Sequence, residues 1–106
     1  MKLLRRRVLD MVVKAAYWAA VRECLSALFG VPDATAARLC QYRRAGVDLA
    51  PAHLRSDIFY HREPFDVAAD LAATLPRSTW HSTQPDIDEP AVRSAYEWIL
   101  AQHGLF

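Results

Sequence analysis

The side chains of this sequence best suited to chemistry are arginines and a glutamine. They form two groups, Arg5, Arg6 and Arg7 near the N-terminus, and Arg38, Gln41, Arg43 and Arg44 further along. Arginine side chains can hold the phosphate backbone of a nucleic acid, and each neutralised phosphate contributes a salt-dependent term to binding. The three consecutive arginines are also what a solvated helix end looks like. These residue types indicate noncovalent recognition of nucleic acid.

Two predicted helices position these groups. Residues 3–29 repeat apolar side chains every three or four residues, which is typical of an amphipathic helix, either in one piece or with a break between residues 19 and 23. A second helix is predicted from Pro32 or Asp33 to Gly46, because proline and an acid suit a first turn and glycine commonly ends a helix. Its expected inward residues are Ala36, Leu39 and Cys40, and its expected solvent-facing residues are Arg38, Gln41, Tyr42 and Arg44.

The connection between these two helices has the features of a tight helical corner. Ser26 is a small residue where the helices would touch, and Gly30 suits the turn. Apolar residues that could form the inner face are Leu25, Phe29, Val31, Ala36 and Leu39. The stretch Gly30-Val31-Pro32-Asp33-Ala34-Thr35-Ala36-Ala37-Arg38 resembles the G-V-S/P-x-x-T-x-x-R core of the helix-turn-helix family of DNA-binding proteins.

This resemblance covers residues 23–41 and implies that the second helix enters the major groove of DNA. By position it implies a phosphate contact from Thr35 and a DNA-facing set of Asp33, Ala34, Ala37, Arg38 and Gln41. A homodimer is consistent with it, because such units commonly read two half-sites. The sequence departs from the family where Asp33 brings a negative charge close to phosphate, and where Ala34 and Ala37 offer no hydrogen bonds to base edges.

Charge is distributed unevenly along the chain. Residues 1–62 contain eleven basic and five acidic residues, a net charge of +6, whereas residues 63–106 contain two and seven, a net charge of −5. Such asymmetry indicates an anionic partner for the basic part, or packing of the two parts on each other. It also leaves open a protein-binding inhibitor or adaptor whose acidic part, residues 63–106, contacts a basic protein partner.

A third interpretation concerns Arg55 and His61. The stretch Arg55-Ser-Asp-Ile-Phe-Tyr-His61 resembles the Arg-x4-6-His motif of HEPN ribonucleases, which are small all-α proteins. The resemblance implies that His61 would act as a general base and that Arg55 would stabilise charge on the phosphate. The alternative is a surface arginine beside a half-buried histidine.

Other chemistry finds little support in the sequence. The four histidines have no metal-ligand spacing, Cys24 and Cys40 are expected to be buried thiols, and neither a G-x-S-x-G motif nor a glycine-rich phosphate loop occurs. We therefore expect no catalytic residues, metal or cofactor, and a protein that is not an enzyme. No apolar run approaches the length of a membrane span, and Asp10 and Lys14 interrupt any signal-like segment, so we expect a cytoplasmic protein.

The composition predicts an all-α protein, because eighteen alanines accompany only three glycines. We expect one helical domain over residues 1–106, a compact bundle of four or five helices with the corner near Gly30. Further helices are predicted over residues 64–75, from residues 88–90 to Gly104, and, in preference to a strand, over residues 51–61. Residues 76–88 are expected to form a polar loop in which Trp80 must find a packing partner.

Overall fold

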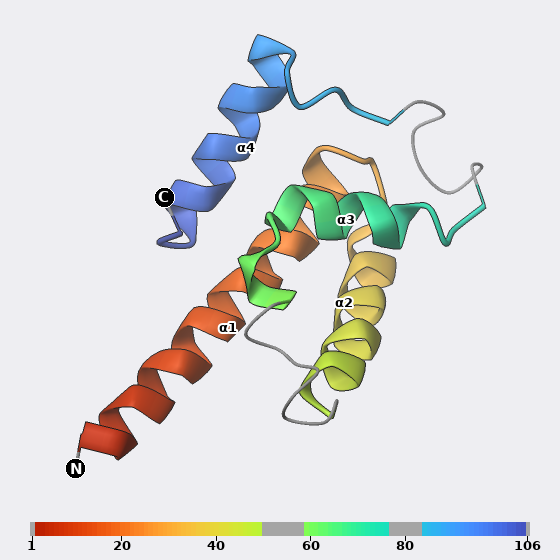
Figure 1. Cartoon of the computed structure of the whole chain (residues 1–106). Helices are drawn as coiled ribbons and strands as arrows, with labels where there is room; N and C mark the ends of the chain where they lie inside the picture. The colour runs from red at the N-terminus through yellow and green to blue at the C-terminus, as the bar shows by residue number, and fades with distance from the viewer. Residues whose placement is uncertain (1, 50–58, 77–83, 106) are drawn as a thin grey trace.

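The computed structural model describes residues 2–49, 59–76 and 84–105, with side chains described from residue 12 onward. Its elements are α1 (Lys2–Ala27), α2 (Asp33–Asp48), a 3-10 helix η2 (Phe59–His61), α3 (Pro64–Ala72) and α4 (Pro90–Gln102). The predicted all-α fold is confirmed, because the described ranges contain four α-helices and no strand (Figure 1). Most of the predicted helix over residues 51–61, and Trp80, lie outside these ranges; Phe59–His61 form the 3-10 turn.

Helix α1 is continuous over 26 residues, with no break between residues 19 and 23. Its sequence contains neither glycine nor proline, so nothing in it interrupts the helical hydrogen bonds. The helix ends where Gly30 adopts a positive φ of 71°, and the Val31 N–H donates a hydrogen bond of 2.9 Å to the Leu25 carbonyl oxygen. This is the glycine-dependent helix end that the sequence predicts.

Helix α2 extends beyond its predicted end at Gly46 and continues to Asp48. A glycine within a helix is disfavoured by about 1 kcal/mol relative to alanine, which does not stop a helix whose last turn is held by packing. Val47 is buried, and Arg44 pairs with Asp48 one turn later at 3.5 Å. These contacts of the last turn explain why the predicted boundary is wrong.

The core forms around α1, on which α2, α3 and α4 pack. Its central side chains come from all four helices and include Val21, Cys24, Leu25, Phe29, Ala36, Cys40, Val67, Ala68, Tyr96 and Ile99. Leu39, predicted to face inward, is only partly buried at the edge of this cluster. With its inner side on α1, α2 leaves its opposite side to solvent.

Helices α3 and α4 both begin with a proline, as the sequence predicts. Val67 and Leu71 are buried on one face of α3, which ends at Ala72, and Leu75 packs at the edge of the core from the turn that follows. Helix α4 buries Tyr96, Ile99 and Leu100, and it is followed by Gly104, whose φ is 70°.

Candidate nucleic-acid interface

At the corner between α1 and α2, Arg22 and Asp33 form a two-point ion pair. The Arg22 Nε lies 2.9 Å from one Asp33 carboxylate oxygen and Nη2 lies 2.6 Å from the other. The Ser26 hydroxyl donates to the Arg22 carbonyl oxygen at 2.9 Å, beside the same carboxylate. Hydrogen bonding to Arg22 lowers the pKa of Asp33, which is therefore ionised and charge-paired at neutral pH. The acid that departs from the helix-turn-helix pattern thus has its charge compensated from within the chain.

The outer face of α2, defined here as Arg38, Gln41 and Tyr42, is exposed to solvent. It lies opposite the buried residues Ala36 and Cys40, because successive residues of an α-helix are about 100° apart. Arg38 donates from Nη2 to the Thr35 hydroxyl oxygen at 3.4 Å. Within the described residues no carboxylate pairs with Arg38. Its guanidinium charge is therefore available to an external anion.

Arg43 and Arg44 lie on the two flanks of α2 rather than on its outer face. The Arg43 guanidinium carbon lies 5.3 Å from the centre of the Phe59 ring, and no acidic partner of Arg43 occurs in the described ranges. Arg44 is half-buried and bound to Asp48. Arg38 and Gln41 are thus neighbours on the exposed side of α2, whereas Arg44, three residues beyond Gln41, has its charge compensated by Asp48.

The N-terminal arginines, Arg5, Arg6 and Arg7, belong to the first turns of α1, and their side chains lie outside the described part of the chain. Figure 1 shows that this end of α1 projects away from the other helices. These residues are therefore remote from the outer face of α2.

A cluster of aromatic rings joins α1 to the segment that follows α2. The Trp18 indole N–H donates to the Tyr60 hydroxyl at 2.9 Å, and that hydroxyl donates to Asp48 at 3.1 Å. The Trp18 and Phe59 rings stack with centres 5.6 Å apart. Burial raises the pKa of Tyr60, so the phenol is a stable donor at neutral pH. This cluster fixes the C-terminal end of α2, and sequence reasoning did not assign it that role.

Two of the grooves that the described residues form bear on the candidate interface. The smaller, of about 430 Å³, runs between α2 and α3, and its lining includes Leu39, Tyr42, Arg43, Val67, Leu71 and Thr74. We call it the α2–α3 groove. It adjoins the outer face of α2 because Tyr42 belongs to both. Its walls come from two separate helices, so no local sequence signal identifies it.

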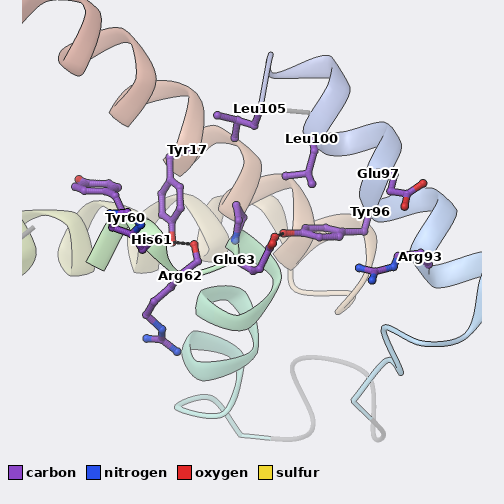
Figure 2. A pocket seen from close by; sticks show the side chains of 11 residues that line it. Tyr17, Tyr60, His61, Arg62, Glu63, Arg93, Tyr96, Glu97, Leu100 and Leu105 are labelled. Atoms are coloured by element: carbon purple, nitrogen blue, oxygen red, sulfur yellow. Dashed lines mark hydrogen bonds between the residues drawn. The ribbon is translucent and has the colours of Figure 1, made fainter. Parts of the chain in front are cut away.

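The larger groove, of about 610 Å³, lies between α1, α4 and the start of α3. Figure 2 shows Tyr96 pointing from α4 toward Glu63. The Tyr96 hydroxyl donates to a Glu63 carboxylate oxygen at 2.5 Å and accepts the Phe65 N–H at 3.4 Å. Burial and the Glu63 carboxylate both raise the pKa of Tyr96. These polar atoms are paired with one another, so they hold α4 in place.

The described residues contain no group of three His, Cys, Asp or Glu side chains that could hold a metal ion. Burial raises the pKa of Cys24 to about 12 and that of Cys40 to about 11, so both buried cysteines remain protonated thiols at neutral pH. No helix in the described ranges is long and apolar enough to cross a membrane.

The other two functional interpretations stay predictions. His61 is exposed at the end of η2, and Arg55 lies outside the described ranges. The structure therefore does not test whether Arg55 and His61 lie close enough to act together in a ribonuclease. For the adaptor interpretation, α4 exposes Glu97 and Trp98, the latter with 59% of its surface accessible.

Comparisons of the chain with protein-family models, with curated proteins and with solved structures found no match.

Proposed function

We propose that this chain is a small non-enzymatic protein that binds nucleic acid through the outer face of α2. The observation that carries the proposal is the position of Arg38 and Gln41. Both are exposed on the side of α2 turned away from the core, and Arg38 has no carboxylate partner in the described ranges. Their side chains supply a phosphate-binding cation and a base-binding amide within one helical turn.

The charges around α2 support the same proposal. Arg22 compensates Asp33, and Arg44 compensates Asp48, so the carboxylates of α2 are paired and do not oppose an approaching phosphate. The uneven charge has an alternative explanation, in which the acidic residues 63–106 pack on the basic residues 1–62 and no anionic partner is needed. Across the described ranges, two pairs connect these parts, Arg62 with Asp70 and His103 with Glu23, and neither involves α2. Arg38 and Arg43, the two arginines of α2 without an acidic partner in the described ranges, therefore remain available to an anionic partner.

Binding to fluorescently labelled oligonucleotides, measured by anisotropy over a range of salt concentrations, tests the proposal. Arg38→Ala should weaken binding about tenfold at low salt. It should also reduce the magnitude of the slope of log affinity against log salt by about 1, as expected for the loss of one phosphate contact. Arg93→Ala is the matched control, because Arg93 is an exposed arginine of α4 that has no acidic partner among the residues described. It should leave affinity close to that of the wild type. Absence of binding to single-stranded and duplex probes at low salt would refute the proposal.

A further inference from the structure

We infer that the nucleic acid bound by α2 is single-stranded, with one unpaired base stacked on Tyr42 beside the α2–α3 groove. The inference depends on the proposed function and specifies its substrate class. Its basis is an exposed aromatic ring placed between two arginines that have no acidic partners in the described ranges, next to an apolar groove.

Tyr42 has 85% of its surface exposed, and its ring and hydroxyl make no hydrogen bond or ring contact within the described residues. The core does not need it, since it lies on the side of α2 away from α1. Gly46 follows it by one helical turn, and a Cβ atom there would meet nothing within 4 Å. The surface of α2 one turn beyond Tyr42 is therefore open at Gly46. Every nucleobase presents a flat face that stacks on such a ring.

The groove continues this surface toward α3. Around α2, Tyr42 lies between Arg38 on the outer face and Leu39 and Arg43 at the groove, at about 100° per residue. The apolar wall consists of Leu39, Val67 and Leu71. Its volume, about 430 Å³, falls within the range of small-ligand sites. The groove is also lined by Arg62 and Asp70, which form an ion pair, so the Asp70 carboxylate is compensated from within the chain. A mainly apolar wall beside cations left unpaired within the described ranges suits a base whose phosphates remain at the rim.

Arg43 adds a positioned charge at that rim. Its guanidinium group lies over the Phe59 ring at 5.3 Å, so the ring restrains the cation without neutralising it. Arg38 lies on the other side of Tyr42, and neither arginine pairs with a carboxylate of the described part. A strand that stacks a base on Tyr42 thus meets one cation on each side. Alternating cations and aromatic rings are typical of surfaces that bind single strands.

The outer face of α2 offers few groups that could hydrogen-bond to the base edges of a duplex. Ala34 and Ala45 share it with Arg38 and Gln41, and alanine offers no hydrogen bond to a base edge. In a duplex, moreover, stacked neighbours cover the faces of the bases, so Tyr42 would gain no stacking partner. The side chains present thus favour unpaired bases over the major groove.

The test compares three labelled probes of equal length, oligo(U) RNA, oligo(dT) DNA and a mixed-sequence DNA duplex, by anisotropy at low salt. Both single strands should bind at least tenfold more tightly than the duplex. Tyr42→Ala should weaken single-strand binding about tenfold, as expected for loss of one base stack, and Tyr42→Phe should retain it. Tyr42→Leu keeps an apolar side chain without the ring, and it should behave like the alanine variant. Trp98→Ala, which removes an exposed aromatic of α4, should change nothing.

The outcomes separate this inference from the proposed function. If the duplex binds as tightly as the single strands, or if Tyr42→Ala leaves single-strand affinity intact, the inference is wrong. The proposed function survives that result provided that Arg38→Ala still weakens binding. If none of the three probes binds, both are wrong.

Discussion

At the scale of the single residue, Arg22 matters because its guanidinium group compensates the negative charge of Asp33. Both side chains of the Arg22–Asp33 pair are largely exposed, and exposed ion pairs contribute little to stability. The pair matters more for binding than for stability, because Asp33 lies in the first turn of α2, which is the proposed binding helix. Without Arg22, its carboxylate would repel a phosphate.

One single and one double variant test this role of Arg22. Arg22→Ala should lower affinity for an oligonucleotide about threefold, because it leaves the Asp33 charge unopposed. The double variant Arg22→Ala with Asp33→Asn should recover most of the loss, since the negative charge is then removed. Anisotropy at low salt measures both. If the double variant binds as weakly as Arg22→Ala, Arg22 itself contacts the nucleic acid.

At the scale of the element, the last turn of α2 shows that contacts can override a local preference. Gly46 lies within this turn, and the buried Val47 and the Arg44–Asp48 pair help to keep the backbone helical there. Gly30, in contrast, has a positive φ that L side chains rarely adopt. Two glycines sixteen positions apart therefore have opposite structural roles.

Exchange of each glycine for alanine should show these opposite roles. Gly46→Ala should raise the free energy of unfolding by about 0.5–1 kcal/mol, because alanine favours helix and its Cβ would meet open space. Gly30→Ala should lower it by about 1–2 kcal/mol, because alanine is strained at positive φ. Urea denaturation followed by circular dichroism measures both. A loss of stability in Gly46→Ala would mean that this turn of α2 is not helical in solution.

These elements also show how far the sequence alone could lead. The starts of α3 and α4 were predictable because proline fits the first turn of a helix, and the end of α1 because Gly30 permits the required φ. The end of α2 was not, since Val47 holds the last turn through tertiary packing. The Arg22–Asp33 pair and the α2–α3 groove are each formed by residues of two helices. The spacing of residues along the sequence does not determine how those helices pack, so neither feature could be predicted.

At the scale of the whole molecule, α4 is attached to the rest by its buried apolar face and by two polar contacts. The first is the hydrogen-bonded group of Tyr96, Glu63 and Phe65 in the larger groove. The second is His103, whose Nε2 lies 2.9 Å from a Glu23 carboxylate oxygen of α1. Among the described residues, the acidic C-terminal part is thus fixed to the start of α3 from the middle of α4 and to α1 from the residue that follows α4.

Removal of the Tyr96 hydroxyl should loosen this attachment. Tyr96→Phe leaves the Phe65 N–H without its side-chain acceptor and Glu63 without its donor, which should lower the free energy of unfolding by about 1–3 kcal/mol. Tyr42→Phe removes a hydroxyl that has no partner in the described ranges, and it should leave stability unchanged. Urea denaturation compares them, and equal stability of the two variants would mean that the Tyr96 hydrogen bonds contribute nothing measurable.

The length of α1 sets a minimum size for any target that extends from the corner between α1 and α2 to the N-terminal arginines. Between Arg6 and the end of α1 at Ala27 the helix rises about 1.5 Å per residue, which places the N-terminal arginines roughly 30 Å from the corner. Stacked nucleotides advance about 3.4 Å each along a strand. A strand whose bases stay stacked must therefore extend over about nine nucleotides to reach from the corner to the N-terminal arginines, and a shorter stacked strand can contact only one end of α1.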